Sequence, residues 1–194
     1  MGALHEGHAT LLRRSVIENP VTVLSVFVNP TQFGPNEDFS RYPRTLPEDG
    51  SIAEKEGVSY LFAPDVEEIY PRGFSTFIDV EGVAAPLCGV FRPGHFRGVA
   101  TVVNRLFSLA QPTSAYFGQK DLQQCLVIQR MVKDLGTPVK IEIVPTVREK
   151  DGLAMSSRNR YLSADEREKA LVIYRAMRAV KEELELGEKS VAAL

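Results

Sequence analysis

The chain reads Val21-Thr22-Val23-Leu24-Ser25-Val26-Phe27-Val28 and then Asn29-Pro30-Thr31-Gln32-Phe33-Gly34. The part before Asn29 is a nearly continuous β-branched run, which is typical of a strand buried on both faces of a parallel sheet. The proline and the glycine that follow predict a loop from Asn29 to Asp38. An apolar strand with a polar loop at its carboxyl end is the arrangement of an α/β protein.

Helical and strand patterns alternate on both sides of this run. Helical patterns cover residues 6–18, 45–57, 98–109 and 122–135, and strand patterns cover 58–62, 74–80, 114–117 and 139–144. Capping boxes at Thr45-x-x-Glu48 and Ser163-x-x-Glu166 mark two helix starts, the second helix reaching about residue 186. This alternation predicts a Rossmann-like, doubly wound, mostly parallel sheet.

The composition narrows the class of protein. With 194 residues, 44% of them hydrophobic and 25% charged, the chain suits one large globular domain or one domain and part of a second. A formal charge of -2 gives no footprint for nucleic acid, and no apolar run approaches the length of a membrane span. Cys88 and Cys125 form neither a CxxC pair nor a zinc set, so we expect reduced thiols and a cytoplasmic location.

Three polar, glycine-bearing segments follow predicted strands, at residues 29–34, 117–121 and 147–160. In doubly wound sheets, ligands bind outside the carboxyl ends of the strands. We therefore expect these three segments to form one ligand site.

All three histidines lie in glycine-flanked motifs, Met1-Gly2-Ala3-Leu4-His5-Glu6-Gly7-His8 and Arg92-Pro93-Gly94-His95-Phe96-Arg97-Gly98. His5 and His8 begin a predicted helix, and their i, i+3 spacing places both rings on one face. We interpret them as donors to phosphate oxygens and to the charge on a departing pyrophosphate, beside the free N–H groups of the helix N-terminus. Two alternatives are a pair of helix-capping histidines and a zinc site, which would need further ligands.

Other polar side chains in these loops suit an anionic ligand. The amides of Asn29 and Gln32 fit a substrate with hydroxyl and carboxylate groups, although a plain Asx/Pro turn explains them equally well. Lys120 can meet phosphates as a point charge, and Gln124 lies one helical turn further on. Met155-Ser156-Ser157-Arg158-Asn159 reads as a compact anion clamp or as a solvated loop.

Taken together, these segments closely resemble the pantoate–β-alanine ligase family of the nucleotidyltransferase superfamily. The matching segments are residues 1–8, 27–34, 42–45, 92–103, 117–121 with Gln123 and Gln124, and 151–159. The resemblance implies an AMP-forming ligase: pantoate attacks Mg-ATP to give pantoyl adenylate and pyrophosphate, and β-alanine then releases pantothenate and AMP. Two alternatives are an adenylyltransferase that acts on a phosphorylated acceptor and an inactive, truncated nucleotide-binding relic.

The resemblance also implies roles for individual residues. Catalytic roles fall on His5, His8, Lys120 and Arg158, with His8 as the family's proton donor. Gln32 and Gln124 are expected to bind pantoate, with Asn29 beside them. Arg92 and His95 are expected to shape the substrate cleft. Glu48 and Asp49 are candidates for a position near Mg²⁺. The ATP contacts are expected at Met1, Gly2, Ala3, Leu4, His5, Glu6, Gly7, His8, Gly118, Gln119, Lys120, Asp121, Val147, Met155, Ser156, Ser157 and Arg158.

The resemblance implies a domain plan as well. We expect residues 1–144 to form an ATP- and pantoate-binding Rossmann-like domain that lacks its first strand, because the family carries a helix and a central strand before the position of Met1. We expect residues 145–194 to be part of a smaller C-terminal α+β lid domain. The chain thus reads as truncated at both ends. The expected partners are the small-molecule substrates and a second copy in a homodimer, with no nucleic acid and no membrane.

Overall fold

The computed structural model of the chain describes residues 2–190. The chain divides into two compact units, Met1–Thr146 and Val147–Leu194. This boundary lies at 146/147, close to the one predicted at 144/145.

Four short strands in the first unit form two parallel pairs. Strand β1 (Val23–Ser25) pairs with β2 (Tyr60–Phe62), with Val23 opposite Tyr60. Strand β3 (Ser114–Gly118) pairs with β4 (Lys140–Val144), with Ser114 opposite Lys140. Parallel strands that are connected through helices confirm the predicted fold class.

Two strand predictions need correction. Among residues 2–190 the strands form two separate pairs, and β1 has only β2 as its neighbour. Thr22 and Leu24 are buried while Val21 and Val23 are 55% and 47% exposed, so this strand is buried on one face and not on both. Residues 74–80 are not a strand, because no residue within 2–190 pairs with them in a β-ladder. The Ile78 N–H donates instead to the Thr101 hydroxyl.

The predicted helices are present. In the first unit they are α1 (Glu6–Glu18), α2 (Leu46–Lys55), α5 (His95–Ala110) and α6 (Leu122–Asp134), joined by the single turns α3 (Val66–Ile69) and α4 (Cys88–Phe91) and by the 3-10 turns η1 (Pro30–Gln32) and η2 (Gln119–Asp121). Helix α5 begins earlier than predicted, because Gly94 caps it in a left-handed conformation (φ 80°) and gives no side-chain signal in the sequence.

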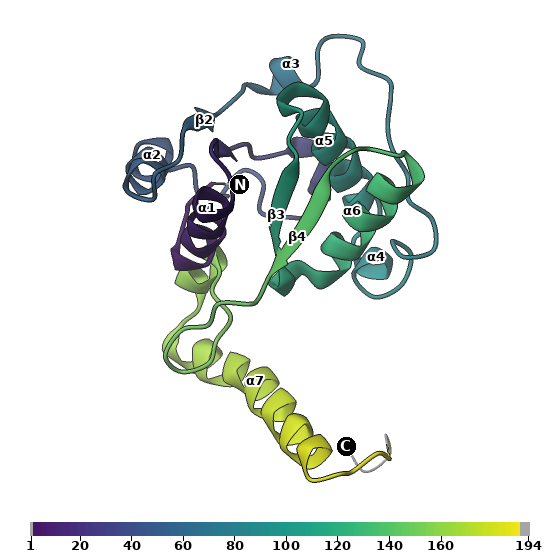
Figure 1. Ribbon diagram of the computed structural model, residues 1–194. Helices are drawn as coiled ribbons and strands as arrows, with labels where there is room; N and C mark the ends of the chain where they lie inside the picture. The colour runs from purple at the N-terminus through teal and green to yellow at the C-terminus, as the bar shows by residue number, and fades with distance from the viewer. Residues whose placement is uncertain (1, 191–194) are drawn as a thin grey trace. The chain divides into compact units, whose positions relative to one another are not determined.

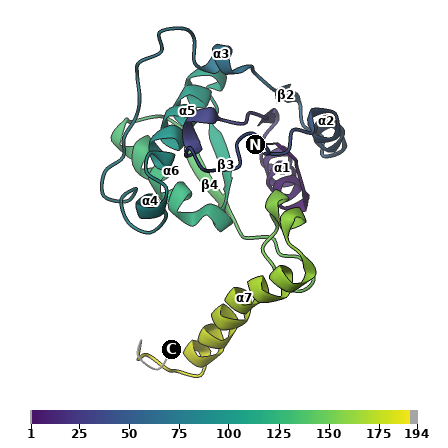
Figure 2. The ribbon, with the colours of Figure 1, turned by 180° about the vertical axis from the view of Figure 1, so that it is seen from behind.

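Helices α5 and α6 supply most of the main core. Their apolar faces bury Phe96, Val99, Phe107, Ile128 and Met131. In Figures 1 and 2, helix α1 lies between α2 and β3, and it contacts both. Arg14 of α1 pairs with the Glu142 carboxylate of β4, and the Asn19 amide donates to the Tyr116 hydroxyl of β3. These contacts fix α1 against the β3–β4 pair, so the helix N-terminus has a defined position.

The second unit consists of a folded loop and a long helix. After the loop come η3 (Ser157–Tyr161) and α7 (Ala164–Glu185), which begins with the predicted Ser163–Glu166 capping box. Gly152 (φ 99°) lies against Tyr174, whose ring would be 2.0 Å from a Cβ at this position. None of the described helices is both long and apolar enough to cross a membrane.

Candidate active site

The first two histidines cap the helix that they begin. His5 is the N-cap of α1, and its Nδ1 accepts the Gly7 N–H at 3.1 Å. His8 completes a capping box, because its Nδ1 accepts the His5 N–H at 3.3 Å. The capping alternative is therefore confirmed as geometry. It does not exclude phosphate binding, since a neutral ring that accepts at Nδ1 carries its proton at Nε2 and can donate there.

The environment of His8 keeps its ring neutral. Burial, with help from the charges of His5 and Lys120, lowers the pKa of His8 from 6.5 to about 3. Helix α1, which begins with these histidines, packs against β3. Burial therefore favours the neutral form of His8, which can donate a hydrogen bond from Nε2.

Asp49 holds the turn that precedes these histidines. Its side chain is fully buried; Oδ1 accepts the Leu4 N–H at 2.7 Å and Oδ2 accepts the Ala3 N–H at 3.1 Å. Ala3 has a φ of 50°, a left-handed conformation that costs an L-residue energy and needs support. The role of Asp49 is therefore that of an anchor for the backbone of residues 3 and 4.

This geometry corrects one prediction. The Thr45 hydroxyl donates to Asp49 Oδ1 at 3.2 Å, so the capping box between Thr45 and Glu48 does not form. Asp49 accepts three hydrogen bonds within the protein, and Glu48 is exposed beside it. Within residues 2–190, no group of three or more His, Cys, Asp or Glu side chains is arranged to hold a metal ion.

Asn29 belongs to the turn and not to the ligand surface. It is 2% exposed, and its Oδ1 accepts the N–H and hydroxyl of Thr31 and the hydroxyl of Tyr70. Its Nδ2 donates to Gly98 O at 3.1 Å and to Gln32 Oε1 at 3.2 Å. These contacts favour a positioning role for Asn29 over direct substrate binding, because both polar atoms of its side chain have partners within the protein.

The two glutamines are placed differently. Gln32 accepts from Asn29 through Oε1, and within residues 2–190 its amide nitrogen has no hydrogen bond. Gln124 lies in the first turn of α6, is half-buried, and makes no side-chain hydrogen bond in the same range. Both amides are therefore available to a ligand.

The carboxyl end of β3 carries the predicted lysine. Gly118–Asp121 forms the strand end and the turn η2, in which Lys120 is exposed with its Nζ 3.4 Å from Asp121 Oδ1. Cys125 anchors this end from α6, since its Sγ donates to Gly118 O at 3.4 Å. Burial raises the pKa of Cys125 to about 11, so the thiol keeps the proton that it donates.

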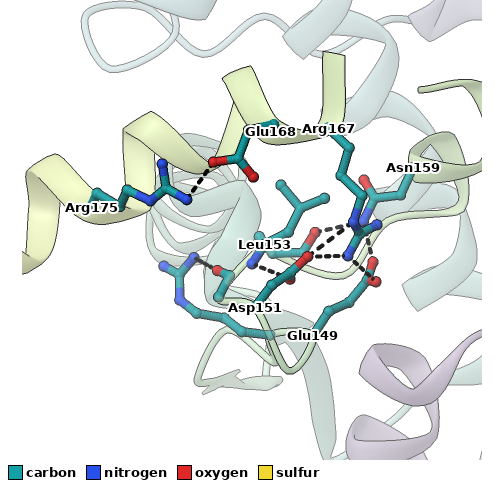
Figure 3. Close-up of polar contacts among 10 residues, drawn as sticks. Glu149, Asp151, Leu153, Asn159, Arg167, Glu168 and Arg175 are labelled. Carbon is teal, nitrogen blue, oxygen red and sulfur yellow. Dashed lines mark hydrogen bonds and ion pairs between the residues drawn. The ribbon is translucent and has the colours of Figure 1, made fainter. Parts of the chain in front are cut away.

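The second unit presents its serine-arginine loop on a charged framework (Figure 3). Arg167 Nη2 contacts Glu149 Oε2 at 2.7 Å and Asp151 Oδ2 at 2.6 Å. Asn159 Nδ2 donates to the other oxygen of Glu149 at 2.6 Å and to Ala154 O at 3.0 Å. Arg167 lowers the pKa of both carboxyl groups, which therefore stay ionised. The sequence pattern did not predict this framework, because the spacing of Glu149, Asp151 and Arg167 does not show that they meet in space.

Backbone contacts complete that loop. Met155 N–H donates to Val147 O at 3.0 Å, and the Ser156 hydroxyl caps η3 by accepting the Arg158 N–H at 3.2 Å. Ser157 is buried and Arg158 is exposed. These hydrogen bonds give the loop a defined conformation, and both interpretations of the segment remain compatible with it.

Comparison with known proteins supplies the family. The family model described as pantoate-beta-alanine ligase matches residues 1–194. The chain belongs to the pantoate–β-alanine ligase family. Membership makes the protein an ATP-dependent ligase and leaves the adenylyltransferase alternative without support.

Individual members of this family are close to the chain in sequence and in structure. Pantothenate synthetases of Roseiflexus sp. (strain RS-1) and Moorella thermoacetica are 60% and 55% identical over the whole chain, which spans 70% and 69% of their lengths. A pantothenate synthetase structure from Thermus thermophilus matches the whole chain and 71% of its own with a TM-score of 0.97 at 58% identity. The structure of the pantoate-beta-alanine ligase from Francisella tularensis, complexed with beta-gamma ATP and beta-alanine, is 43% identical to the chain and has a TM-score of 0.86. The match covers 92% of the chain and 69% of the Francisella tularensis chain.

Proposed function

We propose that this protein joins (R)-pantoate to β-alanine and converts ATP into AMP and pyrophosphate. The family match over the whole chain carries the proposal. The capping histidine pair supports it from the structure, because it presents Nε2 donors at a helix N-terminus, where phosphate groups are favoured. The Francisella tularensis relative is complexed with beta-gamma ATP and beta-alanine, which correspond to two of the three substrates.

The proposed reaction has two steps. A carboxylate oxygen of pantoate attacks the α-phosphorus of Mg-ATP, and pyrophosphate leaves with the electron pair of the broken P–O bond. The amine of β-alanine then attacks the acyl carbon of pantoyl adenylate, loses a proton, and displaces AMP. Neither step needs a side-chain nucleophile, so the work of the protein is alignment, electrostatic stabilisation and exclusion of water.

Four side chains are proposed to stabilise the charge that develops on phosphorus and on pyrophosphate. His5 and His8 donate from Nε2, and Lys120 and Arg158 contribute positive charge. Gln32 and Gln124 hold pantoate through their available amides. The further proposed ATP contacts are the backbone and side chains of residues 1–4, Glu6, Gly7, Gly118, Gln119, Asp121, Val147, Met155, Ser156 and Ser157.

Magnesium is proposed to enter as part of the substrate, Mg-ATP. This cation prefers phosphate oxygens and water and often takes few protein ligands. The fixed position of Asp49 supports that view, because its carboxylate already accepts from Ala3 and Leu4.

Pantoate-dependent exchange of labelled pyrophosphate into ATP, measured without β-alanine, tests the proposal. We expect exchange with pantoate and none without it, followed by AMP release when β-alanine is added. Exchange that needs a phosphorylated acceptor would support an adenylyltransferase instead. Tight ATP binding with no exchange under any condition would support the nucleotide-binding relic.

Two further expectations remain proposals. A homodimer is expected from the family resemblance, and light scattering of the purified protein measures it directly. A cytoplasmic location is supported by two free thiols, Cys88 and Cys125.

A further inference from the structure

We propose that His95, held by Arg92 and Glu37, is a positioning residue that fixes Gln32 for pantoate. The inference rests on the proposed function, because Gln32 is a proposed pantoate contact. His95 is the third histidine of the chain, it is 8% exposed, and the reaction steps above do not use it.

The hydrogen bonds of His95 define its tautomer. Its Nδ1 lies 2.8 Å from the backbone oxygen of Gln32. A carbonyl oxygen only accepts, so Nδ1 must carry the proton. The Nε2 atom of the neutral ring is then an acceptor, and it faces Arg92 Nη1 at 3.0 Å. A guanidinium only donates, so both contacts require the same tautomer.

Arg92 is itself fixed by the loop that His95 holds. Its Nε and Nη2 atoms donate to the two oxygens of Glu37 at 2.7 and 2.6 Å. Glu37 follows Gln32 in the same loop, and its N–H donates to Gly34 O. Arg92, at the end of α4, and His95, the first residue of α5, therefore hold the loop at two points, the carboxylate of Glu37 and the carbonyl of Gln32. A bidentate ion pair has a defined geometry as well as a favourable energy.

The backbones of α5 and η1 also approach each other closely, at Gly98 and Thr31. A Cβ at Gly98 would lie 2.3 Å from Thr31 O, so only glycine permits the observed distance between α5 and η1. The Gly98 carbonyl accepts from Asn29 Nδ2, and the same amide donates to Gln32 Oε1. Gln32 is thus held through its backbone by His95 and through its side-chain oxygen by Asn29.

These contacts give the side-chain amide nitrogen of Gln32 a defined position from which it can donate to the substrate. With Oε1 occupied, Gln32 offers its amide nitrogen, which can donate to a carboxylate or a hydroxyl group. Small misplacements of such a group can lower the rate of a ligation by about a hundredfold, because the reacting atoms must be aligned. Burial lowers the pKa of His95 and outweighs the opposing hydrogen bond to Gln32, which favours the neutral form that this geometry needs.

A matched pair of variants separates the two hydrogen bonds of His95. The amide nitrogen of His95→Asn reaches the position of Nδ1 and keeps the bond to Gln32 O. The amide oxygen of His95→Gln reaches the position of Nε2 and keeps only the bond from Arg92. We expect His95→Gln to raise the pantoate KM by about tenfold with little change in the ATP KM, as expected for one lost buried hydrogen bond. We expect His95→Asn to stay much closer to the wild type.

Controls make the result specific. Ser108→Ala, on the exposed end of α5, should leave both KM values unchanged, and thermal unfolding of each variant identifies any that does not fold. Nitrogen-15 chemical shifts of His95 report the tautomer without any activity, and a ring protonated at Nε2 would overturn the inference.

The kinetic outcomes separate the two claims. A wild-type protein without pantoate-dependent exchange contradicts the proposed function. Suppose instead that the wild type shows exchange, and that the His95 variants leave the pantoate KM unchanged or raise both KM values equally. That result contradicts the positioning role alone.

Discussion

At the scale of the residue, the tautomer that lets His5 and His8 cap α1 is also the one that the proposed phosphate contacts require. Each ring accepts a backbone N–H at Nδ1 and thereby caps α1. The same choice leaves a proton on Nε2, where a phosphate oxygen can accept it. Helix capping and ligand binding therefore require the same protonation state, and the low pKa of His8 maintains it.

Replacing His8 by asparagine or glutamine separates these uses. His8→Asn keeps an acceptor near Nδ1 and loses the outer donor, so we expect pantoate-dependent exchange to fall roughly a hundredfold with little loss of stability. His8→Gln keeps a donor near Nε2 and should recover part of the rate. Equal rates in the wild type and in His8→Asn would remove His8 from the mechanism.

The pKa of His8 also predicts a pH dependence of stability. The folded protein binds the proton only near pH 3, whereas the unfolded chain binds it near 6.5. Between these values the unfolded state holds more protons, so the free energy of unfolding rises with pH by up to roughly 1.4 kcal/mol per pH unit. Above pH 6.5 this contribution is constant.

Urea unfolding of the wild type and His8→Asn at about pH 5 and about pH 7.5, on either side of the ordinary histidine pKa, measures this dependence. We expect the wild type to lose more stability than the variant between the two values. The same change in both proteins would show that His8 does not carry it.

Asp49 gives a residue-scale test that separates structure from metal binding. In Asp49→Asn one side of the group becomes a donor and faces a backbone N–H, so we expect a loss of about 2 kcal/mol in the free energy of unfolding. The Mg²⁺ concentration for half-maximal exchange should not change. If the variant is stable but needs a higher Mg²⁺ concentration for half-maximal exchange, Asp49 is a metal ligand.

At the scale of the element, two of the proposed binding loops are each fixed by a helix that follows later in the same unit. The turn η1 is docked on α5. The loop of residues 147–160 is tied to α7 through Arg167. Loops that must present polar groups to a ligand are more precise when rigid elements support them.

Arg167 and Arg175 on α7 form a matched pair for a test. Arg167→Met removes the cation between Glu149 and Asp151, whereas Arg175→Met breaks only an exposed pair with Glu168 (Figure 3). We expect Arg167→Met to raise the ATP KM by roughly fivefold, which corresponds to about 1 kcal/mol, and Arg175→Met to have no effect. Similar ATP KM values in the two variants would show that the framework does not position the loop.

Helices and the histidine turn were predictable because their signals are local. Ser163 and the apolar spacing of α7 lie within one segment, and so do His5 and His8. The strand pairing was less predictable, because the β-branched run of residues 21–28 does not indicate how many other strands pair with it. The anchor contacts of Asp49 and Asn29 join residues that are distant in the sequence, so neither the family resemblance for Asp49 nor the local pattern for Asn29 could predict them.

At the scale of the whole molecule, the protein is a ligase whose side chains do not enter covalent bonds in the proposed reaction. The described units supply donors, cations and amides, and the family match over the full chain connects them with pantoate activation. The central claim is therefore that a carboxylate oxygen of pantoate bonds to the α-phosphorus of ATP.

Oxygen-18 transfer tests that claim most directly. Pantoate labelled in its carboxylate is incubated with the protein, Mg-ATP and β-alanine, and AMP and pantothenate are analysed by mass spectrometry. Attack on the α-phosphorus predicts one labelled oxygen in AMP and one in the amide carbonyl of pantothenate. Pantothenate formed with unlabelled AMP, or with the label in a phosphate cleaved from the γ-position, would contradict it.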